Sequence, residues 1–411
     1  MNKMNTYTVN RRYLYAYFII SILPLIINFI WILKTHQYKS EFPSTAITVD
    51  LSNFILWSLF FYTAILYILI TYIFFRLQNK RLIISNKIDC YFKRRGLEVF
   101  LFLIMLIRLV FNLKTGRGKA ATDWTINKFS FLVNFFNISQ LFTIYYLSFR
   151  NKINKAFIIL VLLYCCLEIM AGWTGFVLVF FMLELFYRIN SKFVKKYIFY
   201  LPICFFVGAL AYQFLYPLKY YIRLGASVHI SYSDAIIKLF ERLSWFSHSC
   251  VGYQNSDKIV SLYKDYGYSF TEIKGYFRTV IPSFLFPNKD FRSLNNLLMT
   301  TVYPDLSGNT SSNFGQLIYL YNLFKIGIYD FILYFIILFA NTFFYKFFMD
   351  MVKPNKKENK SYSSNYMMFV YFCSIFAVGS LENISYGWQS LIWTYMFLFL
   401  VGVIRVHKIK N

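Results

Sequence analysis

The residues best suited to chemistry are arginines spaced through one long polar stretch, residues 216–312. Arg223, Arg242, Arg278 and Arg292 lie there among many tyrosines. Guanidinium groups present forked donors that fit phosphate oxygens, and aromatic faces pack against sugar rings. An anionic, sugar-bearing ligand therefore suits this stretch, while ion pairs with its own Asp and Glu residues are the structural alternative.

The same stretch holds further candidates. His248 and His229 can exchange a proton near neutral pH, so His248 is a candidate acid or base. Lys289 adds another cation and Tyr276 another aromatic face. A polar segment of this size, in a chain that is otherwise apolar, is expected to carry the active site or to hold a partner.

One ionisable residue lies within an apolar run. Arg108 is followed by further basic residues, Arg117 among them, on a connection expected to face outward. An ionisable side chain at membrane depth marks a functional site by default, unless it extends to the interface. Both arginines are therefore candidate ligands for an anionic lipid-linked group. The carboxylates that could act as a base or as the charge partner of Arg108 are Glu168, Glu184 and Glu382.

Several familiar chemistries are missing from the sequence. It contains no Gly-rich phosphate loop with a Lys-Ser/Thr pair and no His-Glu-x-x-His motif, which argues against a nucleotide-driven pump. The six cysteines show no metal-ligand spacing, and a thiol in an apolar run packs as a small apolar group. We therefore expect no metal and no cofactor.

The composition indicates a membrane protein. Apolar residues make up 58% of the 411 residues and charged residues only 15%, against about 25% in soluble domains. The apolar runs are continuous, so they predict spanning helices and not the alternating strands of a barrel. The net charge of +25 lies in short connections between the runs, and a nucleic-acid partner is therefore not expected.

About ten membrane spans are predicted, so the expected fold class is all-α, a polytopic transmembrane helical bundle. Counting Lys and Arg in the connections places both termini in the cytoplasm, with an uncleaved signal anchor at the first span. The predicted parts are residues 1–215 (about seven spans), a periplasmic loop at 216–312 and residues 313–411 (about three spans). The spans are expected at 13–33, 54–75, 97–113, 129–149, two within 156–187, 198–215, 326–347, 365–381 and 388–404.

Three local features accompany this layout. Residues 156–187 are too many for one span, and turn-prone glycines at 171–175 predict a hairpin. In the loop, 233–246 has the pattern of an amphipathic helix with Ser233 as its N-cap, suited to the membrane interface. Residues 281–289 are interrupted by prolines and predict an ordered extended segment.

Short motifs in and after the loop resemble a known family. Lys274-Gly275-Tyr276-Phe277-Arg278, followed by Ile281-Pro282 and Phe286-Pro287-Asn288-Lys289, is similar to an "Arg, Pro, then Pro-x-Lys" segment. The run Asn313-Phe314-Gly315-Gln316-Leu317, with residues 321–327, is similar to the segment that enters the next span. With the layout of the whole chain, these motifs resemble the O-antigen polymerase (Wzy-type) family of bacterial inner-membrane glycosyltransferases.

The resemblance implies a metal-independent reaction on the periplasmic face. A growing glycan is transferred from undecaprenyl pyrophosphate to the non-reducing-end sugar of an incoming lipid-linked repeat unit, and cations stabilise the leaving pyrophosphate. The expected partners are this lipid-linked oligosaccharide, membrane lipid, and a chain-length regulator and flippase of the same pathway. The catalytic candidates are Arg223, Arg242, Arg278 and His248, and the substrate-binding candidates are Arg108, Arg117, Lys289, Arg292, Tyr276 and Asn313.

The chain departs from the family pattern at two places. Gln316 stands where the family often has Glu, and the turn at 172–175 lacks a frequent Arg, which Arg108 or Arg117 would replace. An O-antigen ligase, with the same architecture and the lipid A core as acceptor, is one alternative function. A flippase or other transporter of lipid-linked oligosaccharides is another, although no internal repeat is found.

Overall fold

The computed structural model describes residues 21–39, 46–78, 88–115, 136–188, 200–225, 227–243, 245–265, 272–274, 276, 293–302, 314–353, 362–372, 379 and 381–408. Within these residues the chain is mostly helical, as predicted. The helices are α2 (Leu23–Thr35), α3 (Asn53–Gln78), α4 (Arg94–Thr115), α6 (Ile138–Phe149), α7 (Lys155–Met170), α8 (Phe176–Arg188), α10 (Tyr200–Leu224), α11 (Tyr232–Leu243), α12 (Phe246–Gln254), α13 (Ser256–Asp265), α15 (Leu294–Val302), α16 (Gln316–Ile326), α17 (Ile328–Met351), α18 (Tyr362–Tyr371) and α19 (Leu381–Leu400). The short strands are β1 (Gln37–Lys39), β2 (Ala46–Thr48), β3 (Ile88–Phe92), β4 (Val352–Lys353) and β5 (Ile404–Lys408).

Within the described residues, three helices are long and apolar enough to cross a membrane, namely α3, α4 and α17. α3 and α4 contain the predicted spans 54–75 and 97–113 and extend beyond both ends of them, whereas α17 begins two residues after the start of the predicted span 326–347 and ends four residues after it. Shorter apolar helices lie at Leu23–Thr35, Phe176–Tyr187 and Leu391–Leu400. The chain is thus compatible with a membrane protein.

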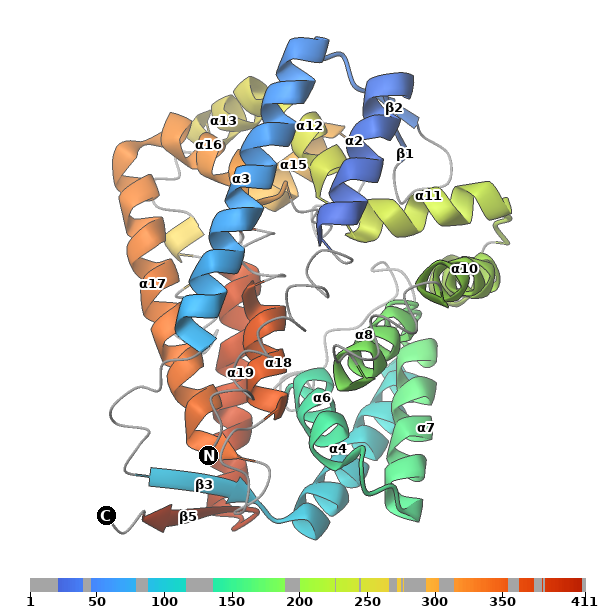
Figure 1. The fold of residues 1–411 in the computed structure, drawn as a ribbon, viewed down its shortest axis with the longest axis vertical. Coiled ribbons are helices and arrows are strands. Elements are labelled where there is room, and N and C mark those ends of the chain that lie inside the picture. Colours follow the sequence, from blue (N-terminus) through green and yellow to red (C-terminus); the bar gives the residue numbers. More distant parts are fainter. Residues whose placement is uncertain are drawn as a thin grey trace.

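Connections that are predicted to share one side of the membrane meet at one end of the molecule. β3 pairs in parallel with β4 and antiparallel with β5, so two connections and the C-terminal strand form one small sheet. Figure 1 shows β3 and β5 at the bottom. The connection between α6 and α7 reaches the same end, because Arg94 donates to the Lys152 carbonyl at 2.7 Å. These connections therefore lie together at one end of the molecule.

The opposite end consists of segments predicted to lie outside. β1 and β2 form an antiparallel hairpin, and the Asp50 N–H after it donates to Gln254 of α12 at 3.1 Å. Asn28 of α2 donates to the Phe240 carbonyl of α11 at 2.9 Å. Buried residues of α12, α13 and α15 belong to the same hydrophobic core as those of α3, α16 and α17. Within the polar stretch 216–312, α12, α13 and α15 therefore pack on the apolar helices through a shared core.

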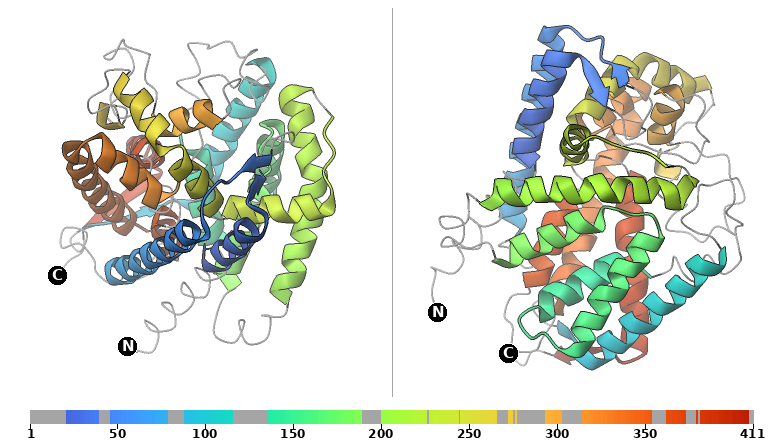
Figure 2. Two further views of the ribbon diagram at one scale, coloured as in Figure 1. Left: turned by 90° about the horizontal axis from the view of Figure 1, so that it is seen from above. Right: turned by 90° about the vertical axis from the view of Figure 1, so that its right-hand side faces the viewer.

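From Tyr200 on, the run at 198–215, an expected span, lies in a helix with a different orientation. α10 continues to Leu224 and lies across the direction of α3 and α17, as the two figures agree (Figures 1 and 2). In Figure 1 it is seen end-on, whereas α11 is seen along its length. Phe205 and Phe240 stack where α10 and α11 meet, with ring centroids 4.4 Å apart. The two helices thus form a crosswise layer.

Two local predictions are confirmed. α7 ends at Met170 and α8 begins at Phe176, and Gly172 in the turn between them has a φ of 65°, which favours glycine. The amphipathic helix exists as α11, which is shorter than the predicted 233–246. Its cap is Ser231 and not Ser233, because the Asp234 N–H donates to Ser231 Oγ at 3.1 Å. The predicted extended segment at 281–289 lies outside the described residues.

Candidate functional site

The predicted arginines of the polar stretch do not meet in the described part of the chain. Arg223 and Arg242 are placed as backbone positions on α10 and α11. Residue 240 contacts residue 205, and Arg223 lies 18 residues further along α10, about 27 Å at 1.5 Å per residue. A pyrophosphate group is much shorter than this separation. The other candidates of the list lie outside the described residues: Arg117, Arg278, Lys289, Arg292 and Asn313.

His248 lies in α12, whose residues from Phe246 to Gly252 are all buried. Its Nε2 is 2.9 Å from the Tyr38 hydroxyl, and the rings of Tyr38 and Trp245 pack edge-on against the imidazole. The side chain is only 8% exposed. In this structure His248 therefore joins the β1–β2 hairpin to α12.

Tyr276 belongs to a buried polar network that anchors its segment on α15, α16 and α17. Its hydroxyl donates to Asn341 at 2.8 Å. Glu272 nearby in the chain is 2% exposed and accepts from the Leu294 N–H at 2.6 Å and from the Tyr319 hydroxyl. Burial and the neighbouring charge of Glu272 raise the pKa of Tyr319 well above its ordinary value, so its hydroxyl stays protonated as the donor.

Gln316, at the position where the resembled family often has Glu, is buried at the start of α16. The Tyr334 hydroxyl lies 3.0 Å from Gln316 Oε1 and 2.7 Å from the Gly379 carbonyl oxygen. Gly379 has a φ of 84°, and a Cβ there would lie 2.9 Å from Gln316 Oε1. Position 316 therefore has a packing role against α17 and the glycine.

Arg108 lies in a polar cluster shared by three helices. It projects from α4, and its guanidinium interacts by charge with Glu168 of α7. Tyr164, one turn earlier on α7, and Ser139 of α6 also lie near the Glu168 carboxylate. α4 packs against both α6 and α7, so these side chains gather where the three helices meet, with Tyr164 buried, Arg108 and Glu168 half-buried and Ser139 exposed. Glu168 is thus the described carboxylate whose charge acts on Arg108.

Three polar atoms in this region have no hydrogen-bond partner among the described residues. They are Arg108 Nε, Asn112 Oδ1 one turn later on α4, and Oε1 of Gln140, which follows Ser139 on α6. A buried polar group without a partner costs about 1–3 kcal/mol. Each such group in a native structure calls for an explanation, and an absent ligand is one. We group Arg108, Asn112, Ser139, Gln140, Tyr164 and Glu168 as the Arg108 cluster, Gln140 through its position next to Ser139 on α6. The cluster offers a cationic donor and neutral acceptors to a polar ligand.

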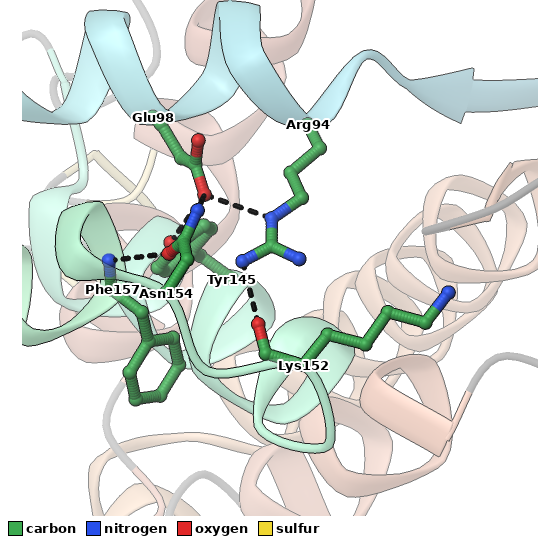
Figure 3. Close-up of polar contacts among 6 residues, drawn as sticks. All are labelled: Arg94, Glu98, Tyr145, Lys152, Asn154 and Phe157. Carbon is green, nitrogen blue, oxygen red and sulfur yellow. Dashed lines mark hydrogen bonds and ion pairs between the residues drawn. The ribbon is translucent and has the colours of Figure 1, made fainter.

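A second polar cluster holds the other ends of the same helices together (Figure 3). Glu98 accepts hydrogen bonds from Arg94 at 2.8 Å, from the Tyr145 hydroxyl at 2.9 Å and from Asn154 at 3.3 Å. Arg94 also donates to the Lys152 carbonyl, and Asn154 caps α7 by accepting from an N–H of its first turn. These contacts, the Glu98 cluster, link the start of α4 to the α6–α7 connection. They fix the relative positions of the helices that carry the Arg108 cluster.

Arg108 and Glu168 are candidates from the sequence, whereas the four other members of the Arg108 cluster are not. The sequence contains a signal for two of them, Asn112 and Tyr164. Asn112 lies four residues after Arg108 and Tyr164 four residues before Glu168, so each pair shares a helix face. Polar pairs at this spacing within an apolar run indicate a face turned toward protein. Glu184 has a different partner, since it forms an ion pair with Arg150 at 2.6 Å.

No group of three or more His, Cys, Asp or Glu side chains that could hold a metal ion occurs within the described ranges. No family model, no curated protein and no solved structure matches this chain.

Proposed function

We propose that the protein is an O-antigen polymerase, a glycosyltransferase that joins undecaprenyl-pyrophosphate-linked repeat units on the periplasmic face of the bacterial inner membrane. The observation that carries the proposal is the Arg108 cluster. Arg108 is half-buried and its guanidinium is under the charge of Glu168, with Nε lacking an acceptor among the described residues. An ionisable pair within apolar helices is costly, and pairs of this kind mark substrate pathways.

The position of the cluster along the helices also supports the proposal. Glu168 lies two residues before the end of α7, and the turn that follows contacts α10. α10 in turn packs against α11, whose Phe240 carbonyl is bonded to α2. The cluster is therefore at the end of α4 and α7 that is nearest to the polar stretch 216–312.

In the proposed reaction the bond between the sugar C1 and the pyrophosphate oxygen breaks as an acceptor hydroxyl forms the new glycosidic bond at C1. The pyrophosphate leaves with the bonding electrons, and the hydroxyl proton passes to a base. Arg108 stabilises the charge on the leaving oxygens, a contribution of about 2.7–4 kcal/mol in comparable oxyanion sites. Glu168 orients the guanidinium, and Asn112 and Gln140 accept hydrogen bonds from hydroxyl groups of the ligand.

Deletion of the gene in a bacterium that makes O-antigen tests the function. The ladder of polysaccharide chain lengths on lipid A should collapse to a single repeat unit, and the wild-type gene should restore it. An intact ladder rules the proposal out. Loss of all O-antigen from lipid A indicates the ligase instead, and transport of labelled lipid-linked oligosaccharide in proteoliposomes without chain growth indicates a transporter.

The proposal includes the finer topology, with cytoplasmic termini and a periplasmic stretch at 216–312. The predicted total of about ten spans counts the run at 198–215, whose residues from Tyr200 on lie crosswise in α10. Asp257 has a side chain that is 96% exposed, and Lys152 is exposed at the opposite end. In a cysteine-free variant, a cysteine at position 257 should react with a membrane-impermeant maleimide added to spheroplasts. A cysteine at position 152 should react only after the membrane is opened, and the reverse pattern contradicts the orientation.

A further inference from the structure

One face of α10 consists of large apolar side chains that are exposed. They recur every three or four residues and are between 39% and 72% exposed: Ile203, Val207, Leu210, Phe214, Leu218 and Tyr221. The opposite face packs on protein, because Tyr212, Tyr216 and Tyr220 form a buried cluster with Ala235 of α11. α10 therefore has one side on the fold and one side, its exposed face, turned toward the surroundings.

The direction of α10 differs from that of the helices suited to cross a membrane. Its 25 residues measure about 37 Å at 1.5 Å per residue, so its length alone would allow a crossing. It lies crosswise to α3 and α17, which are long and apolar enough to cross (Figures 1 and 2). When α3 and α17 cross a bilayer, α10 lies along the plane of that bilayer.

The surroundings of α10 carry the aromatic residues of a membrane interface. Its second half lies beside the turn between α7 and α8, where Trp173 is 59% exposed. Tyr200 and Tyr221, near the two ends of α10, are 56% and 65% exposed. Trp and Tyr are enriched at the level where acyl chains meet headgroups. A helix in the plane holds both tyrosines at one such level, whereas a crossing helix holds them at opposite levels.

The composition of the exposed face favours lipid over another helix as its covering. Helices that pair in a membrane meet through small residues, which let their backbones approach closely. The six members of the exposed face include no small residue and no charged one. The small residues of this part of α10, Gly208, Ala209 and Ala211, are half-buried or buried. The exposed face therefore matches acyl chains and not a second copy of α10.

We propose that α10 lies in the plane of the outer leaflet, with its exposed face inserted among the acyl chains of bulk phospholipid. In this position α10 anchors the polar stretch 216–312 to the membrane surface, because α11 packs against its other side. A helix of this kind buries its apolar face about 5–10 Å into the boundary between headgroups and acyl chains. The in-plane direction does not rest on the proposed transferase activity, since it uses no residue of the Arg108 cluster.

The end of the molecule at which the polar stretch lies is fixed by other contacts. Glu184 of α8 forms an ion pair with Arg150, which ends α6 beside the α6–α7 connection. Asn28 of α2 donates to the Phe240 carbonyl of α11 at the opposite end. The chain thus changes ends between α8 and α11 whatever the direction of α10.

Depth measurements along α10 in proteoliposomes test the proposal. In a cysteine-free full-length variant, single cysteines are introduced on the exposed face, and a nitroxide on each reports its accessibility to oxygen and to a water-soluble nickel complex. The substitutions are Ile203→Cys, Val207→Cys, Leu210→Cys, Phe214→Cys and Leu218→Cys. All five labels should lie at one depth within about 5 Å, the rise of one helical turn, whereas a crossing helix separates the first from the last by about 22 Å.

The matched control is the exposed face of α3. Labels at Phe54→Cys, Phe61→Cys and Ile65→Cys, which are exposed positions, should become deeper in this order. A label that prevents folding is left out, because the remaining positions on α10 still define the slope.

Three outcomes overturn the proposal. A change of depth along α10 as steep as that along α3 makes it a crossing helix. Access of the nickel complex to all five labels, without access of oxygen, means that water covers the face. Spin–spin broadening that disappears on dilution with unlabelled protein means that a second copy covers it.

Discussion

The two polar clusters on α4, α6 and α7 differ in how completely their hydrogen bonds are made. In the Glu98 cluster, one carboxylate accepts three hydrogen bonds, and its donors Arg94 and Asn154 make further contacts. In the Arg108 cluster, one donor and two acceptors have no partner among the described residues. The same three helices carry both clusters, so poor packing of the bundle does not explain the difference. A polar network whose hydrogen bonds are all made stabilises a fold, whereas functional sites commonly keep arrangements that lower the stability of the fold.

The largest expected effect is on activity at the Arg108 end. Under the proposed function, Arg108→Ala should lower chain elongation in proteoliposomes about 100- to 1,000-fold, because the leaving pyrophosphate would lose a charge-stabilising donor. Its thermal unfolding in detergent should stay close to that of the wild type. Arg108→Lys keeps the charge without the forked geometry and should fall between the two. Full elongation activity in Arg108→Ala contradicts the functional role of the Arg108 cluster, and with it the difference drawn between the two clusters.

At the Glu98 end of the same helices, we expect the largest effect on the free energy of unfolding. Glu98→Ala removes the acceptor of three hydrogen bonds and should lower the free energy of unfolding by about 2–4 kcal/mol. Glu98→Gln keeps an acceptor and should lose about half as much. Activity per folded molecule, from elongation normalised to the folded fraction, should be unchanged. A selective loss of activity in Glu98→Gln, with stability intact, assigns this cluster to function instead.

Substitution of Glu168 distinguishes a residue that only positions Arg108 from one that acts as the catalytic base. Glu168→Gln keeps the shape of the side chain and removes the charge that acts on the Arg108 guanidinium, so under the proposed function elongation should fall about tenfold, within the usual range for such supporting groups. If Glu168 only orients Arg108, the pH profile of the residual activity should keep its shape. If the acidic limb of the profile disappears in the variant, Glu168 is the base.

The smallest expected effects on stability are those of substituting one asparagine in each cluster, Asn112 in the Arg108 cluster and Asn154 in the Glu98 cluster. Asn112→Leu removes an acceptor that has no partner among the described residues, and should raise the free energy of unfolding by about 1 kcal/mol while lowering activity. Asn154→Ala removes the N-cap of α7 and should lower the free energy by about 1 kcal/mol, with activity per folded molecule unchanged. Chemical unfolding and elongation assays measure both. The comparison fails if the two substitutions shift stability in the same direction.

Much of the helical layout was predictable from the sequence. The apolar runs at 54–75 and 97–113 are parts of α3 and α4, and the run at 326–347 lies in α17 from Ile328 on, because a run of that length satisfies its backbone hydrogen bonds only as a helix in an apolar environment. The break between α7 and α8 followed from glycine at the turn, and α11 from its apolar periodicity. These features depend on residues close together in the chain.

The candidate site was predictable only in part. Arg108 stands out as a charge inside an apolar run, but which of three carboxylates partners it depends on how α4 packs against α7. Tyr276 and His248 were chosen for their chemistry, and both are engaged in buried contacts with residues distant in the sequence, Asn341 and Tyr38. Roles for Arg117, Arg278, Lys289, Arg292 and Asn313 stay predictions, since these residues lie outside the described part of the chain.

The sequence by itself determined that this chain forms long apolar helices joined by basic connections, with one polar stretch at 216–312 and one arginine within a span. Only the tertiary structure decided that Arg108 faces Glu168, that Glu98 closes the opposite end of the same helices, and that α10 lies crosswise. The physical reason is the range of the interactions. Periodicity and capping act within a few residues, whereas the direction of an apolar helix and the partner of a buried charge are set by contacts between helices that the chain brings together.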